Sequence, residues 1–354
     1  MNFKITLFLT SFFPRLIIIL LTIVLFSVNL IQYTNLHDGK EYKIYAKAIA
    51  EFDVQNLPSD TTRLYPGYPL IINLISEPLG FSLSSILVTI IFSIASVFLF
   101  YKITTHKWLS LYFSIFTPSW LLFSSLAMSE GLFVFLSLLA IYLFSKSRFA
   151  FSFLALGFNT IVRPVGILLF LPMLLIMILE KRNRWIILSS IIIYLLFPLF
   201  WLISSQIVWG NMGQNIIKYI ELDFSLPFAS LISGTLSHNV SIMKKILVWG
   251  NILLGVVALI ILIHKYLGKQ DSFILLMTLW LGISLLFYLS LSSRWTFSCL
   301  DRFMITCLFP IFIGLERFFP KNKWVFLIIL ALSIGICLYW NHNLIVVLKA
   351  RGLL

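Results

Sequence analysis

The chain has 354 residues, of which 60% are hydrophobic and only 11% are charged. Its mean hydropathy of +1.02 excludes an ordinary soluble globular domain. The net charge of +13 does not indicate a nucleic-acid surface, because the basic residues form short clusters between apolar runs. We therefore expect membrane lipids, and no nucleic acid, as partners of this chain.

Unbroken Leu, Ile and Phe runs predict membrane-spanning helices, since a helix of roughly 20 apolar residues crosses the hydrocarbon layer. The alternating short strands of a transmembrane barrel are missing from the pattern. The predicted fold class is therefore an all-α polytopic bundle of about eleven spans. The expected spans are residues 15–31, 82–101, 109–125, 131–145, 149–162, 165–179, 185–208, 246–263, 273–291, 303–319 and 324–340.

The basic residues predict the orientation of these spans, because short cytoplasmic loops are enriched in Lys and Arg. With the N-terminus cytoplasmic and the C-terminus outside, fourteen of the 26 basic residues lie in inner segments. They are Lys4, Arg15, Lys102, Lys107, Lys146, Arg148, Lys181, Arg182, Arg184, Lys265, Lys269, Arg317, Lys321 and Lys323. The two longest polar stretches, 32–81 and 209–245, then fall on the outer face, where we expect the active site. Frequent Ile, Phe, Lys and Asn residues are typical of a low-GC bacterium, and this favours the plasma (inner) membrane.

The first outer stretch carries Asp38 immediately after the first span. A carboxylate at this point could act as a base that reaches both water and lipid, or it could simply cap the helix that follows. That helix, residues 38–52, is predicted to lie in the membrane interface with Tyr42, Tyr45 and Ile49 facing the lipid.

Two prolines, a glycine and two tyrosines follow in the segment from Arg63 to Pro69, which includes Tyr65 and Tyr68. This composition predicts an irregular turn rather than a regular helix. Irregular backbone at membrane depth is tolerated where it lines a cavity, so the segment is a candidate cavity wall. The alternative is a rigid turn that contacts no ligand.

Three further charged residues lie near the outer ends of predicted spans. Glu130 has no basic neighbour in the sequence, so it indicates either a functional carboxylate or an ion pair, for instance with Arg163. Arg163 and Arg302 offer planar donors to a lipid phosphate. They could equally be anchors whose charged ends reach the interface, and Arg302 could pair with its neighbour Asp301.

The second outer stretch carries Glu221, Asp223 and His238, whose spacing matches no metal-ligand or triad pattern. The three cysteines form no CxxC motif, so no disulfide framework or zinc site is predicted. Nucleotide-binding and hydrolase motifs are also missing from the sequence.

Four motifs in order resemble the GT-C superfamily of polytopic glycosyltransferases, particularly bacterial mannosyltransferase-like members and relatives of GPI mannosyltransferase II. They are Asp38-Gly39-Lys40-Glu41-Tyr42 after the first span, the turn Tyr65 to Leu70, Pro118 with Ser129-Glu130-Gly131-Leu132-Phe133, and Arg163-Pro164-Val165-Gly166. The likeness covers residues 15 to 180, and beyond them only Asp301-Arg302-Phe303 resembles a later family element. The chain thus divides into a GT-C-like module, 1–180, and a variable C-terminal module, 181–354.

The resemblance implies a polyprenyl-phosphate sugar donor and transfer of a mannose-like hexose, with inversion, to a lipid, glycan or protein acceptor on the outer face. Asp38 would be the base, Arg163 and Arg302 would stabilise the departing phosphate, and Glu130 would hold sugar hydroxyls or a basic partner. Arg63, Tyr65 and Tyr68 would contribute to substrate binding. No cofactor is implied, and the need for a divalent metal stays open.

The sequence departs from the family pattern at His37 and Lys40, a difference that would allow a different acceptor. It also lacks the second acidic residue of the Asp-Glu pair of protein O-mannosyltransferases. A flippase or an O-antigen polymerase, which also needs outer-face arginines, is the alternative function.

Overall fold

The computed structural model describes residues 2–58, 61–211, 226, 228–237, 242–291, 300 and 302–352. Within these residues the chain is helical and has no β-strand. Six of the described helices are long and apolar enough to cross a membrane. They are α1 (Phe3–Phe26), α4 (Gly67–Thr104), α10 (Arg184–Trp209), α13 (Ile242–Lys269), α14 (Ser272–Leu289) and α17 (Lys323–Ala350). The all-α polytopic fold class is thereby confirmed, while the count of eleven spans stays a prediction.

Shorter helices complete the bundle. Three of them coincide with predicted spans: α7 (Glu130–Ser145), α8 (Phe149–Val162) and α9 (Ile167–Leu179), the last preceded by the 3-10 turn η2 (Pro164–Gly166). The first outer stretch holds α2 (Leu30–Thr34), α3 (Gly39–Ala50) and the 3-10 turn η1 (Val54–Asn56). The second outer stretch, 209–245, is described only in part and includes α12 (Ala229–Leu236).

Two predicted spans are not continuous helices. Residues 109–125 form α5 (Lys107–Ile115) and α6 (Pro118–Phe123), because Pro118 has no amide hydrogen to continue α5 and instead begins a new helix. Residues 303–319 form η3 (Ile305–Cys307), α16 (Leu308–Gly314) and η4 (Glu316–Phe318).

The predicted outer stretch 32–81 also ends earlier than expected, because α4 already begins at Gly67. The helix bends at Gly80, whose φ of 73° is a left-handed value that glycine adopts without a steric penalty. The expected span 82–101 is the part of α4 that follows this bend.

Helix α3 is not an interfacial helix with its tyrosines in lipid. Tyr42 and Tyr45 are 4% and 1% exposed, and the Tyr42 ring packs edge-on against Tyr68 of α4 at 4.8 Å. The predicted lipid-facing orientation was wrong because α3 packs against α4, and both tyrosine rings are buried within the protein.

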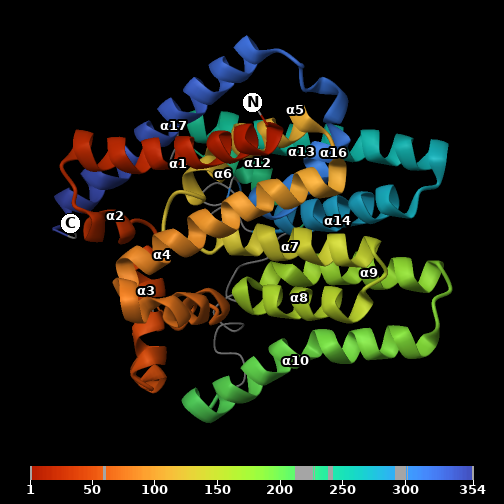
Figure 1. Ribbon diagram of the computed structural model, residues 1–354, viewed down its shortest axis with the longest axis horizontal. Coiled ribbons are helices and arrows are strands. Elements are labelled where there is room, and N and C mark those ends of the chain that lie inside the picture. Colours follow the sequence, from red (N-terminus) through yellow and green to blue (C-terminus); the bar gives the residue numbers. More distant parts are fainter. Residues whose placement is uncertain are drawn as a thin grey trace.

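The long helices run roughly along the horizontal direction of Figure 1, with α2, α3 and the C-terminus at its left end and the α9–α10 and α13–α14 connections at its right end. Contacts between the basic loops support this arrangement. The Lys102 ammonium lies over the Tyr142 ring, the Arg182 guanidinium lies over Phe149, and Lys107 lies over Phe3. The segments predicted to be cytoplasmic therefore meet at one end of the bundle.

At the opposite end of the bundle, two glycines allow neighbouring segments to pack closely. A Cβ on Gly39 would lie 2.2 Å from the Thr34 carbonyl oxygen, and one on Gly131 would lie 2.7 Å from the Thr89 carbonyl oxygen. These glycines allow the first turn of α3 to pack against the chain before it, and the first turn of α7 to pack against α4. Asp38 and Glu130, which each precede one of these glycines, are thereby fixed close to the same region.

One arginine lies inside the bundle, far from any carboxylate of the described residues. Arg15 in α1 is fully buried, donates to the Ser11 carbonyl oxygen at 2.5 Å and lies over the Trp120 ring of α6. Its Nε and Nη2 atoms have no hydrogen-bond partner within the described part of the chain. Helix α17 packs on the same part of α1, where Asn341 donates to Thr22 at 2.9 Å.

Candidate active site

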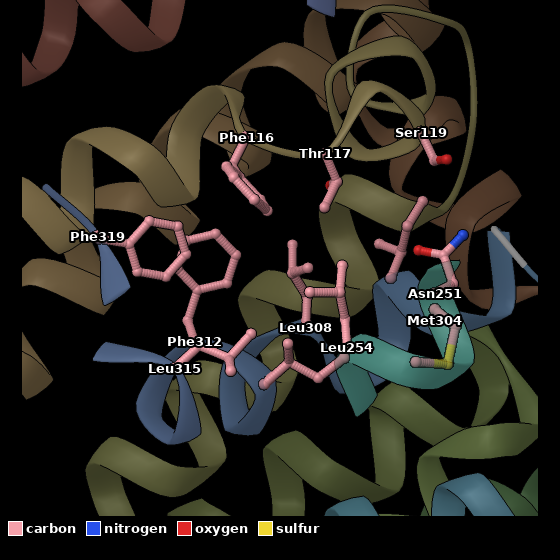
Figure 2. Close-up of a pocket in the computed structure, with 12 residues that line it drawn as sticks. Phe116, Thr117, Ser119, Asn251, Leu254, Met304, Leu308, Phe312, Leu315 and Phe319 are labelled. Carbon is pink, nitrogen blue, oxygen red and sulfur yellow. The ribbon is translucent and has the colours of Figure 1, made fainter. Parts of the chain in front are cut away.

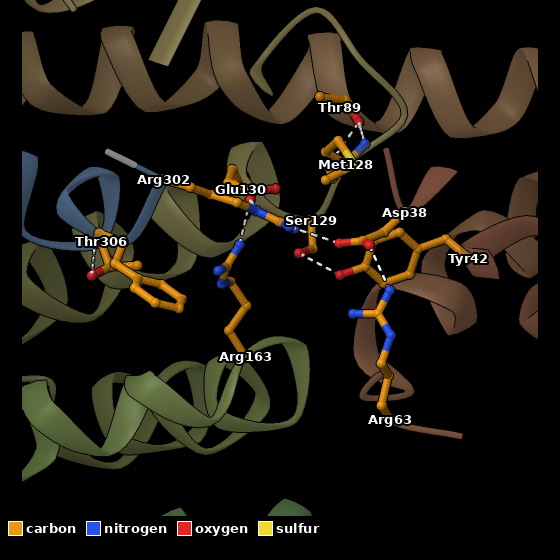
Figure 3. Close-up of polar contacts among 11 residues, drawn as sticks. Asp38, Tyr42, Arg63, Thr89, Met128, Ser129, Glu130, Arg163, Arg302 and Thr306 are labelled. Atoms are coloured by element: carbon orange, nitrogen blue, oxygen red, sulfur yellow. Dashed lines mark hydrogen bonds and ion pairs between the residues drawn. The ribbon is translucent and has the colours of Figure 1, made fainter. Parts of the chain in front are cut away.

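Five charged side chains form a continuous chain of ion pairs at the end of the bundle opposite the basic loops (Figure 3). In order, they are Arg63, Asp38, Arg302, Glu130 and Arg163. The sequence analysis singled out all five separately, and the structure brings them together. Three arginines and two carboxylates leave one positive charge in excess within this group.

The Asp38 carboxylate accepts hydrogen bonds from two arginines. Its Oδ1 lies 2.6 Å from Nη2 of Arg63, and its Oδ2 lies 2.7 Å from Nη1 of Arg302. Within the described residues its carboxylate accepts no hydrogen bond from the backbone of α3, so the capping interpretation does not hold. Burial raises the pKa of Asp38, but the charges of Arg302 and Arg63 outweigh this effect and hold it below its usual range. Asp38 is therefore ionised at neutral pH.

Glu130 begins α7 and is fully buried. Its Oε1 accepts a hydrogen bond from Nη1 of Arg163 at 2.5 Å and another from Nε of Arg302. The ion pair with Arg163 that the sequence suggested is therefore present. Because a buried carboxylate without cationic partners is very costly, the two arginines are what permit Glu130 to be charged here.

Arg302 joins the two carboxylates although it lies 172 residues after Glu130 in the chain. Its guanidinium also lies over the ring of Phe123, with 5.4 Å between Cζ and the ring centroid. The alternative pairing with Asp301 cannot be followed, since Asp301 lies outside the described residues. Arg302 uses the fork geometry of its guanidinium to bond both carboxylates, which a lysine could not reproduce.

The two tyrosines of the predicted turn occupy different positions. Tyr65 is buried in the bend before α4. Tyr68 lies in the first turn of α4, is fully buried, and bonds the Thr89 hydroxyl at 2.7 Å. The Tyr68 ring packs against Tyr42, whose hydroxyl lies 2.9 Å from that of Ser129, the residue before Glu130.

The sequence analysis missed Tyr42, Ser129 and Phe123 as members of this site. Ser129 precedes Glu130, so its position was the available signal for it. Phe123 gave no signal, because one more aromatic residue in an apolar stretch is indistinguishable from core.

An apolar cleft opens near the site between α6, α13 and α16 (Figure 2). One end is lined by Thr117, Ser119, Asn251 and Met304, the last only two residues from Arg302. The cleft shares Phe116, Leu254, Leu315 and Phe319 with a neighbouring cavity of about 360 Å³, which is bounded by Leu253 and Phe318. Both of the latter are exposed, so this end of the cleft opens to the surface of the bundle.

No group of three His, Cys, Asp or Glu residues that could hold a metal ion occurs among the residues the structure describes. Glu221, Asp223 and His238 of the second outer stretch lie outside those residues. The chemistry available in the described site is that of fixed cations and carboxylates, suited to binding an anion beside a potential base.

We compared the sequence and the structure of this chain with those of known proteins. No protein-family model matches the chain, and no curated protein matches it. Among solved structures, it is similar to the crystal structure of ArnT from Cupriavidus metallidurans bound to undecaprenyl phosphate, with a TM-score of 0.59 at 12% sequence identity. The match covers 92% of this chain and 62% of the ArnT chain. This chain has a GT-C fold.

The GT-C fold expected from the sequence motifs is thereby confirmed over nearly the whole chain. The match extends well beyond residue 180, where the sequence resemblance had weakened. The proposed division into modules 1–180 and 181–354 stays a prediction, and the site itself takes Arg302 from the second of them.

Proposed function

We propose that this chain is a membrane glycosyltransferase that transfers a hexose from a polyprenyl-phosphate donor to a hydroxyl group, with inversion at the anomeric carbon. The observation that carries the proposal is the placement of Arg302 between Asp38 and Glu130 in a GT-C fold. This arrangement provides a fixed cation for a phosphate immediately beside a carboxylate that can act as a base.

The donor phosphate is the anion that best fits the excess positive charge. The similar ArnT structure contains undecaprenyl phosphate, a lipid with the same kind of headgroup. Arg302 and Arg163 would donate to the phosphate oxygens as the bond to the sugar breaks, when negative charge on the leaving group increases. Interactions that strengthen in this way lower the barrier rather than only binding the donor.

The apolar cleft offers a place for the lipid chain of the donor. Its lining is hydrocarbon over most of its length and its polar end lies near Arg302. We propose that the polyprenyl chain enters from the membrane past Leu253 and Phe318, so that its phosphate arrives at the arginines.

Asp38 would receive the proton of the acceptor. In this reaction the acceptor oxygen attacks the anomeric carbon, the bond from that carbon to the phosphate oxygen breaks, and the phosphate keeps the electron pair. The acceptor proton passes to Asp38. Since two arginines weaken Asp38 as a base, transfer of Arg302 from Asp38 to the incoming phosphate would restore its basicity.

The remaining predicted site residues receive supporting roles. Arg63 is the most exposed member of the ion-pair chain and would contact substrate directly. Tyr65 and Tyr68 are buried, so we propose that they fix the wall of the site and act on substrate only through neighbours such as Tyr42. The hexose is proposed to be mannose-like, the acceptor a lipid, glycan or protein, and the site to lie on the outer face of the plasma membrane.

The test is transfer of radiolabelled hexose from polyprenyl-phosphate donors to membrane acceptors, comparing wild type with Asp38→Asn at matched expression. We expect label transfer with wild type and a loss of at least a hundredfold in the variant. Equal activity of the two proteins would refute the assignment of Asp38. No transfer by wild type from mannose, glucose or galactose donors would instead favour a flippase or polymerase of lipid-linked glycans.

A further inference from the structure

His37 precedes Asp38 and has an uncommon backbone conformation. Its φ of 53° places it in the left-handed region, which non-glycine residues seldom occupy. The turn that holds it lies between α2 and α3, and Leu36 on its other side is fully buried. Leu36 is buried and Asp38 is ion-paired, so the backbone is held on both sides of His37.

The imidazole of His37 contacts the same aromatic ring as Arg302. The His37 and Phe123 ring centroids are 5.1 Å apart in an edge-on arrangement, and the Arg302 guanidinium lies over Phe123. Phe123 is 6% exposed, so it serves as a buried support for both side chains. His37 is therefore held within the region of the ion-pair chain.

Unlike its neighbours, His37 is exposed, and among the described residues nothing hydrogen-bonds its ring nitrogens. The surrounding protein and the positive charge of Arg302 lower the pKa of His37. The ring is thus neutral at physiological pH, with one nitrogen able to donate a hydrogen bond and the other able to accept one. Such a side chain suits an uncharged polar ligand better than an anion.

We propose that His37 binds the acceptor: its imidazole hydrogen-bonds one hydroxyl of a sugar or polyol while the neighbouring hydroxyl faces Asp38. This inference rests on the proposed function and narrows its acceptor class. Both side chains lie beside Arg302: Asp38 is paired with it, and His37 contacts the Phe123 ring that it covers. An acceptor with several hydroxyls could bond both side chains. A serine or threonine side chain of a protein, with a single hydroxyl, would leave His37 unused.

The experiment measures initial rates with a radiolabelled polyprenyl-phosphate hexose, at varied concentrations of an octyl glycoside acceptor. We expect His37→Phe, which keeps an aromatic ring but removes both polar nitrogens, to raise the acceptor KM about tenfold. The donor KM is expected to stay within twofold of wild type. His37→Gln, which retains a donor and an acceptor, is expected to recover most of the acceptor affinity.

His342→Phe is the matched control. His342 in α17 is also exposed and also contacts a phenylalanine, Phe26, with 5.2 Å between ring centroids, but it lies outside the ion-pair chain. It should leave both KM values unchanged. A serine-containing peptide tests the acceptor class, since wild type should favour the glycoside and His37→Phe should lose much of that preference.

The outcomes separate this inference from the proposed function. Transfer by wild type with an unchanged acceptor KM in His37→Phe would overturn the role of His37 and leave the glycosyltransferase proposal standing. Preference of wild type for the peptide would overturn the acceptor class. Absence of transfer by wild type to either acceptor would overturn the proposed function and this inference together.

Discussion

At the scale of single residues, the site depends on the geometry of one guanidinium. Arg302 bonds Asp38 through Nη1 and Glu130 through Nε, so both carboxylates are held by different nitrogens of one planar group. A lysine would keep the charge but offers a single point donor. Charge alone therefore does not explain the arrangement, and the shape of the side chain can be tested separately from its charge.

Arg302→Lys is expected to lower kcat about a hundredfold or more, the usual effect of losing a fixed donor at a developing charge. Steady-state transfer assays with the purified variant measure this effect. Arg182→Lys, which alters an exposed ion pair with Glu180 at the other end of the bundle, is the matched control and should retain full activity. Near-normal kcat in Arg302→Lys would show that only the positive charge matters.

Arg63→Gln tests the electrostatic coupling to Asp38. Arg63 contributes to holding the pKa of Asp38 below its usual range, so removing this charge raises the pKa. Protonation of Asp38 then begins at a higher pH, and the acid limb of the pH profile of kcat/KM should move upward. An acid limb at the same pH in Arg63→Gln and wild type would mean that Asp38 does not control it.

Most charged residues of the site could be predicted, because a charge in an apolar stretch is conspicuous. Glu130, Arg163 and Arg302 each stood at the end of a predicted span, and Asp38 stood in the outer stretch after the first one. The pairing of Glu130 with Arg163 was among the alternatives considered. The ion-pair partners of Asp38 and Arg302 could not be predicted, since they depend on tertiary packing. The buried orientation of Tyr42 was missed for the same reason.

At the scale of helices, two glycines determine how closely the elements of the site approach. Gly131 packs against α4 with no room for a side chain, and Glu130 precedes it directly. The sequence did not reveal this contact, because a glycine in an apolar run can equally be a neutral position. The division of residues 109–125 into α5 and α6 could have been inferred from Pro118, but hydropathy alone predicted one span.

Gly131→Ala is expected to destabilise the protein by about 1–3 kcal/mol, because the added methyl group meets the Ser93 hydroxyl at 2.5 Å and the Thr89 backbone. It should also reduce activity, since α7 carries Glu130. Thermal unfolding in detergent and the transfer assay measure the two effects. Gly335→Ala in α17, where no atom lies within 4 Å, is the control and should be neutral or slightly stabilising. Equal melting temperatures for the two variants would contradict the packing argument.

At the scale of the whole molecule, the GT-C fold separates basic loops from the ion-pair chain along the bundle. The connections that carry Lys102, Lys146 and Arg182 meet at one end, and the site lies at the other. Sequence patterning predicted this separation because loop charge and span order are both local properties. The orientation in the membrane is a further prediction.

The orientation of the chain in the membrane can be tested with single introduced cysteines that react with a maleimide. The background for these variants is Cys299→Ser, because Cys307 and Cys337 are buried and should not react. A membrane-impermeant maleimide applied to intact cells should label Asn56→Cys and Lys47→Cys, which lie on exposed positions of the first outer stretch. It should label Lys146→Cys only after the cells are opened. The reverse pattern would place the site in the cytoplasm.

The buried arginine of α1 has a consequence for biogenesis. Arg15 is covered by Trp120 of α6, and α1 is joined to α17 by the bond between Thr22 and Asn341, 319 residues apart. During synthesis α1 is therefore made before α6, the helix that covers its charge, has been translated. Stable insertion of α1 is therefore expected to require α6, whose Trp120 covers Arg15. Nascent chains that stop short of α6 would expose this charge, and quality-control proteases should remove them.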